Sequence, residues 1–199
     1  MAWAPDYVVL EDAKRWVRLA VTDELDDAEI ALIISAASRG IDDHCNRQFG
    51  KTAGAEERLY TAWYDDERER WIVDTDDFQS ASGLTISVDG VAATEYTKEP
   101  VNAPQEGKPW EAITFKRTAP VVPTGLEFEV SVTANPFGWT AFPAQVPLGT
   151  RLQINRFLAR RDAAFGIAGS PESQLRLLSQ LDPDVAVSLR GLRRPRKVG

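Results

Sequence analysis

The apolar residues of this chain repeat with a helical period near both ends and with the pattern of short strands between them. In the N-terminal part, five apolar residues follow one another at steps of four, three, four and four: Ile30, Ile34, Ala37, Ile41 and Cys45. These steps place all five on one face of a helix. This is the clearest periodicity in the sequence, and it predicts a long amphipathic helix that ends before Gly50.

A shorter helix is predicted before this one, from about Leu10 to Ala20, because its apolar residues also share one face. A polar break over residues 22–27 separates the two predicted helices. Asp26 followed by Glu29 resembles a capping pair, in which side-chain oxygens accept hydrogen bonds from the free backbone N–H groups at a helix start. We therefore expect the long helix to begin near Asp26.

The segment from Glu57 to Trp139 has the pattern of an antiparallel sheet or small barrel. Asp89-Gly90 lies between two β-prone runs and predicts a tight hairpin, since both turn positions favour positive φ. Charged and polar residues alternate with apolar ones over residues 127–132, which predicts a strand with one wet face. The predicted strands cover Arg58–Trp63, Arg70–Val73, Leu84–Val88, Val91–Thr97, Ala112–Lys116 and Glu127–Thr133.

A helix is predicted again from about Val146, and it carries apolar residues on two sides. Leu148 and Leu152 lie on one of these sides. A helix that is apolar on two sides must pack against other residues on both, and a neighbouring subunit can supply one of the two contacts. The residues expected in the core or at a subunit interface are Leu152, Ile154, Phe157, Leu158, Arg160 and Arg161. Leu175, Leu178 and Leu181 have the spacing of a further short helix.

These patterns predict an α+β fold, in which helices from both ends of the chain form a small bundle and an antiparallel β-rich lobe is inserted between them. The expected parts are an N-terminal helical part (1–55), the β-rich lobe (56–140), a C-terminal helical part (141–182) and a basic C-terminal arm (183–199).

The C-terminal segment differs in charge from the rest of the chain. Residues 145–199 hold ten Lys and Arg against four acids, a net charge of +6, whereas residues 1–144 hold 13 against 26, a net charge of −13. The arginines have apolar neighbours, which favours a docking arm over a solvated tail. The expected contact residues of this arm are Val185, Leu189, Arg190, Leu192, Arg193, Arg194, Arg196 and Lys197.

The composition argues against several other classes of protein. The apolar runs are too short to cross a bilayer, and the N-terminal residues do not have the pattern of a signal peptide. The single cysteine, Cys45, fits a reducing compartment, so we expect a soluble protein made in a cytoplasm. An acidic net charge of −7 argues against a body that coats nucleic acid non-specifically.

Few residues suggest catalysis, a cofactor or a metal. His44 beside Cys45 has no second His or Cys to complete a ligand set, and adjacent helical residues point in different directions. The acidic runs at residues 65–69 and 74–77 lack the spacing of a calcium loop, so solvated turns are the favoured interpretation. We expect no enzyme, no cofactor and no metal site.

A set of segments carries a resemblance to a known family of proteins: Tyr7–Trp16, Asp26-Asp27, Ala36–Asp42, Cys45–Gly50, Phe137–Trp139, Arg156–Asp162 with Phe165-Gly166, and Leu181–Val185. They cover both ends of the chain well and the β-rich middle only loosely. These segments resemble phage head-to-tail connector (adaptor) proteins. Val9 departs from the resemblance, because such proteins commonly have a Thr helix cap at this position.

The resemblance implies a structural virion protein at the head–tail junction. It implies a homo-oligomeric ring, typically of twelve subunits, that binds the portal protein and a downstream stopper or tail-completion protein. It also implies a channel through which double-stranded DNA passes without specific binding. Two rival hypotheses remain: a nucleic-acid-binding module that uses the basic C-terminal segment, and a carbohydrate- or metal-dependent enzyme built on the β-rich lobe.

Overall fold

The structure is a computed structural model of the 199-residue chain, and it describes residues 3–20, 22, 24–162, 167–168, 175–176 and 181–195. The chain divides into two compact units. The helical unit contains Ala4–Arg47 and Phe142–Gly199, and the β unit contains Gln48–Ala141 together with Trp3. Helices thus lie in one unit and two antiparallel sheets in the other, so the predicted α+β fold class is confirmed.

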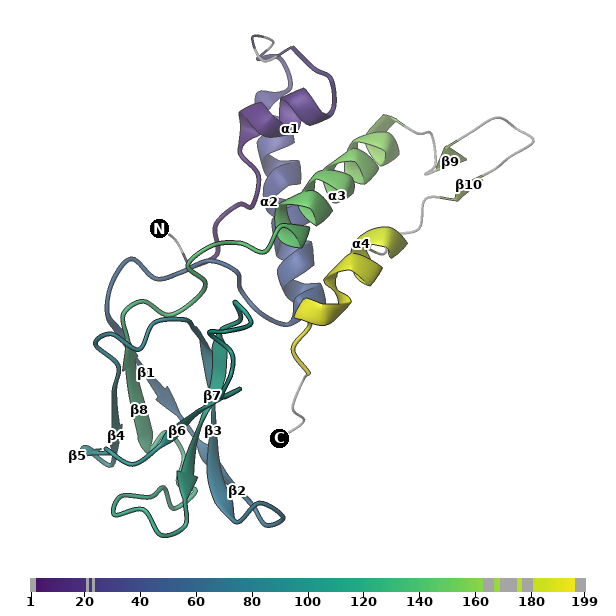
Figure 1. Ribbon diagram of the computed structural model, residues 1–199. Coiled ribbons are helices and arrows are strands. Elements are labelled where there is room, and N and C mark those ends of the chain that lie inside the picture. The colour runs from purple at the N-terminus through teal and green to yellow at the C-terminus, as the bar shows by residue number, and fades with distance from the viewer. Residues whose placement is uncertain are drawn as a thin grey trace. The chain divides into compact units, whose positions relative to one another are not determined.

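The helical unit is built from both ends of the chain (Figure 1). Its helices pack around a core of apolar residues that includes Ala13, Ile34 and Ile154. Two-residue strands, β9 (Ile167–Ala168) and β10 (Leu175–Arg176), pair antiparallel. Leu175 is therefore in a strand and not in the predicted short helix, while Leu178 is outside the described residues. The helices are α1 (Leu10–Trp16), α2 (Asp27–Cys45), α3 (Gln145–Asp162), α4 (Pro183–Leu189) and the 3₁₀ turn η2 (Arg190–Leu192).

The long amphipathic helix predicted from its periodicity is α2. Its buried residues include all five that defined the pattern, Ile30, Ile34, Ala37, Ile41 and Cys45. The helix ends at Asn46, which adopts the left-handed conformation (φ 52°) that ends many helices. Asp26 is the residue before the helix, as predicted, but its side chain makes no capping hydrogen bond. The proposed capping pair is therefore not formed.

The first helix, α1, is shorter than predicted and ends at Trp16. Val9 precedes it and offers no side-chain oxygen, so no side-chain cap forms at this helix start. The N-terminal strap before α1 is held by Arg39 of α2, whose guanidinium donates to the carbonyl oxygens of Ala4 (2.7 Å) and Pro5 (2.6 Å).

Helix α4 packs closely on α3 because a glycine opposes it. A Cβ added at Gly149 of α3 would lie 3.1 Å from Val185 Cγ1, and 3.4 Å from Ile41 Cδ1 of α2. Val185 and Leu189 are fully buried at this junction of three helices. The start of α4 is capped by Asp182, whose carboxylate accepts a hydrogen bond from the Asp184 backbone N–H at 2.9 Å.

The β unit consists of two four-stranded antiparallel sheets. The strand orders are β1-β8-β4-β5 and β2-β3-β7-β6, and only Thr61 separates β1 in one sheet from β2 in the other. The strands are β1 (Glu56–Tyr60), β2 (Ala62–Asp65), β3 (Arg70–Phe78), β4 (Thr85–Val88), β5 (Val91–Ala92), β6 (Thr97–Glu99), β7 (Trp110–Lys116) and β8 (Val130–Ala134).

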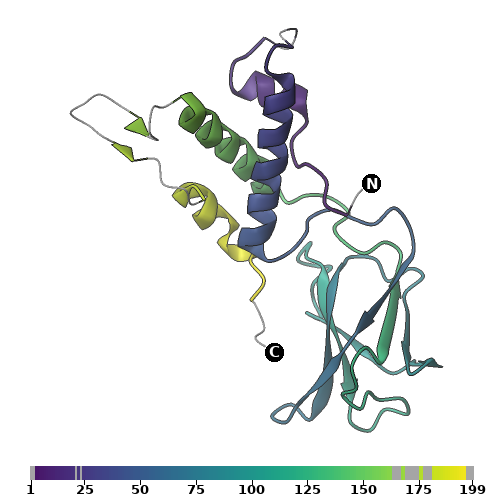
Figure 2. The same ribbon diagram turned by 180° about the vertical axis from the view of Figure 1, so that it is seen from behind.

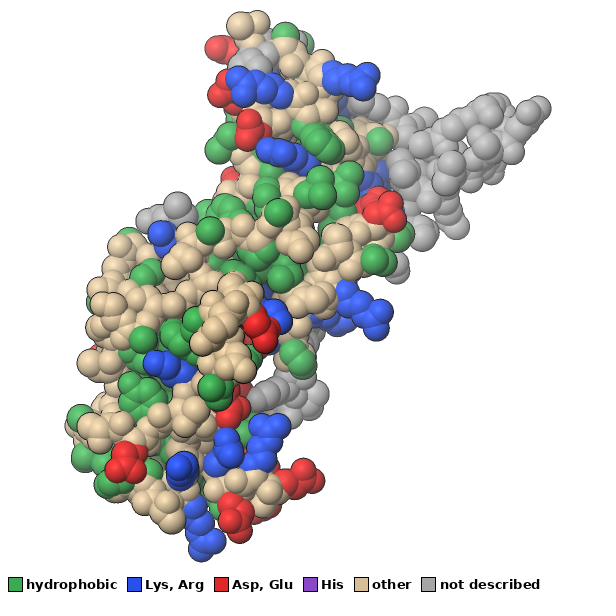
Figure 3. Space-filling model, viewed as in Figure 1, with side chains coloured by type: hydrophobic (Ala, Val, Ile, Leu, Met, Phe, Trp, Pro, Cys, Tyr) green, Lys and Arg blue, Asp and Glu red, His purple; other side chains and the backbone are tan. Residues whose placement is uncertain are grey.

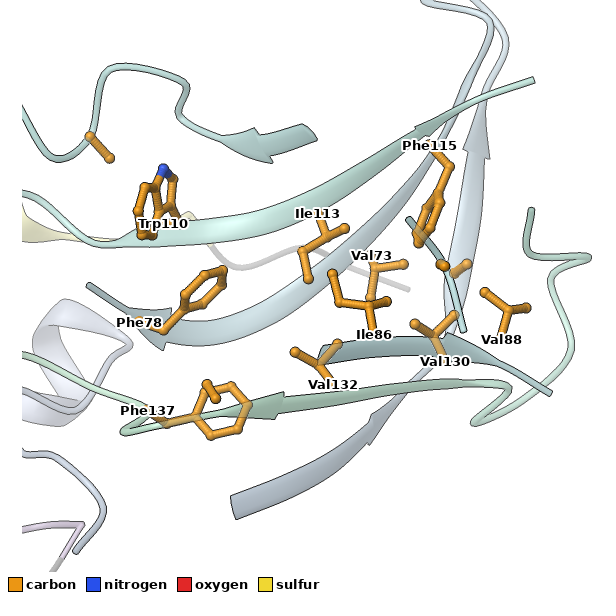
Figure 4. Close-up of a cluster of buried hydrophobic side chains, with 14 residues drawn as sticks. Val73, Phe78, Ile86, Val88, Trp110, Ile113, Phe115, Val130, Val132 and Phe137 are labelled. Carbon is orange, nitrogen blue, oxygen red and sulfur yellow. The ribbon is translucent and has the colours of Figure 1, made fainter. Parts of the chain in front are cut away.

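The core of the β unit lies between its two sheets (Figure 4). Side chains of β3 and β7, such as Phe78 and Ile113, point toward those of β4 and β8, such as Ile86 and Val132. Alternate residues of each strand point to the same side, which is why every second residue of β8 is buried.

The tight hairpin predicted at Asp89-Gly90 is confirmed. Val88 pairs with Val91 across the turn, and both turn residues have positive φ, 47° at Asp89 and 77° at Gly90. The alternation predicted for residues 127–129 is wrong, because Phe128 is exposed with φ 57° and Glu129 is buried. The Glu129 carboxylate accepts hydrogen bonds from the Thr124 and Gly125 backbone N–H groups, so it turns inward and the strand begins only at Val130.

The segment Phe137–Trp139 closes the β unit against residues 50–52. Gly138 (φ 100°) leaves no room for a side chain, since an added Cβ would lie 2.0 Å from the Gly50 carbonyl oxygen. Phe137 is in the core, and the Trp139 indole N–H donates to the buried carboxylate of Asp77 at 2.7 Å. A segment that resembles the connector proteins in sequence thus has a packing role in this unit.

Candidate interaction surfaces

The basic C-terminal segment is partly a component of the helical unit. Val185 and Leu189, expected to contact a partner, are fully buried between α3, α4 and α2. Beyond α4, the Arg194 backbone N–H donates to the carbonyl oxygen of Cys45 at 2.8 Å and ties the segment to the end of α2. The expected separate arm therefore does not begin at residue 183, because α4 docks there first.

The exposed part of the expected arm is its arginines. Arg190 and Arg193 are exposed, while Leu192 and Arg194 are half-buried. Arg196 and Lys197 lie outside the described residues. The described residues of the expected arm therefore form an exposed cationic end of the helical unit, and the buried residues of α4 hold this end in place.

The residues expected at a core or subunit interface on α3 differ in burial. Ile154 is fully buried, and Phe157 and Leu158 pack half-buried against the same core. Leu152 and Arg160 are half-buried. Arg161 forms ion pairs with Glu29 (3.2 Å) and with Asp26 (3.9 Å).

Arginines of α3 form further ion pairs with acids of both ends of the chain. Arg151 Nη2 lies 3.3 Å from Asp12 Oδ2 of α1, and its guanidinium lies 5.8 Å from the centre of the Trp16 ring. Arg156 lies 3.2 Å from Asp182, next to α4. These partly exposed pairs contribute little stability individually, but they orient the helices that bear them.

A buried polar cluster joins the N-terminal strap to α2. The Tyr7 hydroxyl donates to the Asp42 carboxylate, and the Tyr7 backbone N–H donates to Ser38 Oγ at 3.1 Å. Arg39 Nε lies 3.1 Å from the same carboxylate. Burial raises the pKa of Asp42 to about 6, although the Tyr7 hydrogen bond and the Arg39 charge oppose this rise. These contacts tie the strap to α2, so the cluster has the character of a structural network.

The remaining candidates for chemistry have ordinary environments. Cys45 is buried, and burial raises the pKa of its thiol to about 11, which keeps it protonated and unreactive. Asp65 in the first acidic run accepts hydrogen bonds from the backbone N–H groups of Glu67 and Arg68 and caps a turn. Within the described residues, no three His, Cys, Asp or Glu side chains are placed to hold a metal ion.

The helical unit has two exposed apolar faces, and the sequence pattern indicated only the one on α3. On α2, Leu32 is 72% exposed, and Leu25 in the preceding turn is 90% exposed. On α3, Leu148 is 46% exposed, on the side away from Ile154. The sequence signal for the first face is the uncharged run from Ile30 to Ser38, since a helix that is apolar all round needs more than one cover.

No helix among the described residues is both long enough and apolar enough to span a bilayer. No family model matches the sequence, and no curated protein matches it. The structure is similar to a chain from the neck of an empty GTA particle, a structure computed with C6 symmetry. The TM-score is 0.51 at 17% sequence identity, and the alignment covers 100% of this chain and 96% of that chain. The similarity is one of fold, and it extends over the whole of this chain and nearly all of the other.

Proposed function

We propose that this chain is a structural virion protein, a head-to-tail connector (adaptor) that forms a ring at the junction between capsid and tail. In this role it binds the portal protein on one side and a stopper or tail-completion protein on the other. We propose a ring of twelve subunits, which leaves a channel through which double-stranded DNA passes without specific binding.

The observation that carries this proposal is the fold similarity to a chain of a GTA particle neck over the whole of this chain and nearly all of the other. This chain has two units, and the alignment covers 100% of the chain, so both units take part in the match. The segments that resemble connector proteins in sequence, among them Phe137–Trp139 and Leu181–Val185, support the same role. They lie at the closure of the β unit and at the start of α4.

Electron cryomicroscopy of assembled particles tests the proposal. Density that fits both the helical and the β unit is expected in a ring at the portal vertex, between the portal and the first tail component. Particles that contain the portal and tail but no density for this chain at that position would contradict the proposal.

The cationic end of the helical unit is the portal-contacting surface in this proposal. A variant with Arg190→Glu and Arg193→Glu is expected to bind purified portal at least about tenfold more weakly, because it reverses two exposed charges. Arg117→Glu, which reverses an exposed charge in the β unit, is the matched control and is expected to bind normally. Portal binding by the double variant at the wild-type level would remove this surface from the proposal.

The rival function, nucleic-acid binding, rests on the same exposed arginines. It predicts that the isolated chain binds duplex DNA with an affinity that falls steeply as salt rises, since phosphate contacts release counterions. The connector function predicts weak DNA binding, because the rest of the chain is acidic. Tight, salt-sensitive binding that Arg190→Glu with Arg193→Glu abolishes would favour the rival.

A further inference from the structure

The side of α2 that points away from the core is exposed, and it is uncharged over the run from Ile30 to Ser38. Ala28, Leu32 and Ala36 follow one another at steps of four, all three are exposed, and Leu25 precedes them in the turn. With Leu25, these residues form the outer α2 face. Small residues on either side of a leucine allow the backbone of another helix to approach closely.

The side of α3 opposite its buried residues has a similar composition. Leu148, Asn155 and Ala159 are exposed, Ala144 before the helix is exposed, and Leu152 is half-buried between them. These five residues form the outer α3 face. Arg151 and Arg156 flank this face on a helical wheel, while Val146, Thr150 and Ile154 occupy the buried side.

The two faces lie on opposite sides of the helical unit. Helix α3 is in front of α2 in Figure 1, and α2 is in front of α3 in Figure 2, which shows the unit from behind. In Figure 3, hydrophobic side chains gather over the helical unit on the side where α3 is nearest the viewer. The buried sides of α2 and α3 pack on one another, so their outer faces point away from each other.

The two helices that carry these faces have charges of opposite sign. Helix α2 holds one Arg against four Asp and Glu, whereas α3 holds four Arg against one Asp. Some of these charges pair within the unit, as Arg161 does with Glu29. The half of the unit with α2 is therefore acidic and the half with α3 is basic.

We infer that the outer α2 face of one copy of this chain docks on the outer α3 face of a second copy, in a head-to-tail contact. Both faces belong to one unit, both are uncharged, and they lie in halves of opposite net charge. Contact of an α2 face with another α2 face would bring two acidic halves together, and contact between two α3 faces would bring two basic halves together. Like charges at an interface suppress such pairings.

A head-to-tail contact uses two different surfaces of each copy and leaves one of each unused at the ends. Such a contact repeats from copy to copy and closes into a ring where the rotation allows. The inference thus names the subunit contact of the ring and rests on the proposed function for its closure. The α2 and α3 faces themselves, and the pairing between them, are independent of what the ring binds.

Cysteine cross-linking tests the contact. The double variant Leu32→Cys with Leu148→Cys is expected to give a ladder of dimers, trimers and larger species with a bismaleimide, in the purified full chain at high concentration and in assembled particles. Each single variant is expected to give at most about a tenth of this yield, because one cysteine has no partner on the facing surface. Cys45, the cysteine of the wild type, is buried, so the wild type is expected to give no cross-linked species.

The matched control is Leu126→Cys with Leu148→Cys, which moves one cysteine to an exposed leucine of the β unit and is expected to give no ladder. Dimers formed as strongly by either single variant as by the double would show that a face meets itself. A double variant without a ladder in both samples would also overturn the contact. If microscopy still places the chain at the portal vertex, only this inference fails and the connector function stands.

Charge substitution gives a second and independent outcome. Leu32→Glu disables only the α2 face and Leu148→Glu only the α3 face, and both residues are exposed, so both variants are expected to fold. Each variant alone is expected to remain monomeric. Their mixture is expected to form a one-to-one dimer and nothing larger, since one intact face remains on each. A mixture that stays monomeric at concentrations where the wild type associates would contradict the head-to-tail contact.

Discussion

Two buried carboxylates, Glu129 in the β unit and Asp42 in the helical unit, are each held by polar or charged neighbours. Glu129 accepts hydrogen bonds from the Thr124 N–H and hydroxyl and from the Gly125 N–H, at 2.6–2.9 Å. Asp42 accepts one from the Tyr7 hydroxyl and lies beside Arg39. Burying a carboxylate is unfavourable unless it is paired or hydrogen-bonded, so both residues specify the local chain path as well as stabilise it.

Glu129→Gln is expected to destabilise the β unit by about 1–3 kcal/mol, because one carboxylate oxygen is replaced by an NH₂ group that cannot accept a hydrogen bond. Chemical denaturation followed by tryptophan fluorescence measures the change. Glu127→Gln, two residues away and exposed, is the matched control and is expected to change stability by less than about 0.5 kcal/mol. Equal effects of the two substitutions would contradict the assigned role of Glu129.

Asp42 makes the stability of the helical unit depend on pH. Burial raises its pKa from 3.8 to about 6, against the opposing effects of Tyr7 and Arg39, while Asp43 adds to the rise. The folded state then holds the proton more tightly than the unfolded state. This contribution to stability is complete below about pH 4 and is lost as the pH rises through about 6.

The free energy of unfolding of the wild type, relative to Asp42→Asn, is therefore expected to fall by up to about 3 kcal/mol between about pH 4 and pH 7. Urea denaturation followed by far-UV circular dichroism at each pH measures this difference. Asp43→Asn, at the exposed neighbouring position, is expected to show a much smaller change. A difference that rises with pH would reverse the sign assigned to Asp42.

At the scale of elements, α4 decides how the basic C-terminal segment is presented. It is only seven residues long, and isolated helices of this length are unstable in water. Its stability comes from packing, because Val185 and Leu189 fill the space that Gly149 leaves open. A docked α4 holds Arg190 and Arg193 at a defined place, which a free arm would not.

Gly149→Leu is expected to displace α4, because even a Cβ at this position would lie 3.1 Å from Val185. The amides of Val185–Leu189 are then expected to exchange with solvent hydrogen at least about tenfold faster than in the wild type. Ala159→Leu adds the same side chain on the exposed side of α3 and is the control. Unchanged protection of α4 in Gly149→Leu would mean that the helix does not depend on this contact.

The local elements of this chain were largely predictable, and their partners were not. The steps between Ile30 and Cys45 predicted α2, and Asp89-Gly90 predicted a hairpin, because both signals act over neighbouring residues. Val185 and Leu189 were interpreted as contact residues of an arm. Apolar residues beside arginines indicate that something packs on them, but the residue against which Val185 packs is Gly149 of α3, 36 residues earlier in the chain (185 − 149).

At the scale of the whole molecule, net charge and apolar surface are distributed unevenly along the chain. The basic residues gather toward the C-terminal end and the acids elsewhere, which the composition of the two parts shows directly. The helical unit combines one acidic and one basic segment, because both ends of the chain contribute to it. A unit with opposite charges in its two halves can associate head to tail with copies of itself.

The amino-acid sequence was sufficient for the α+β class, for the order of helical and β-rich segments and for the basic C-terminal end, because these depend on composition and on spacing between near neighbours. It was not sufficient to show which apolar residues are covered. Val185 and Leu189 were expected at the surface of an arm, and both are fully buried. Burial depends on contacts between residues far apart in the chain, such as Gly149 with Val185, and only the folded structure brings these together.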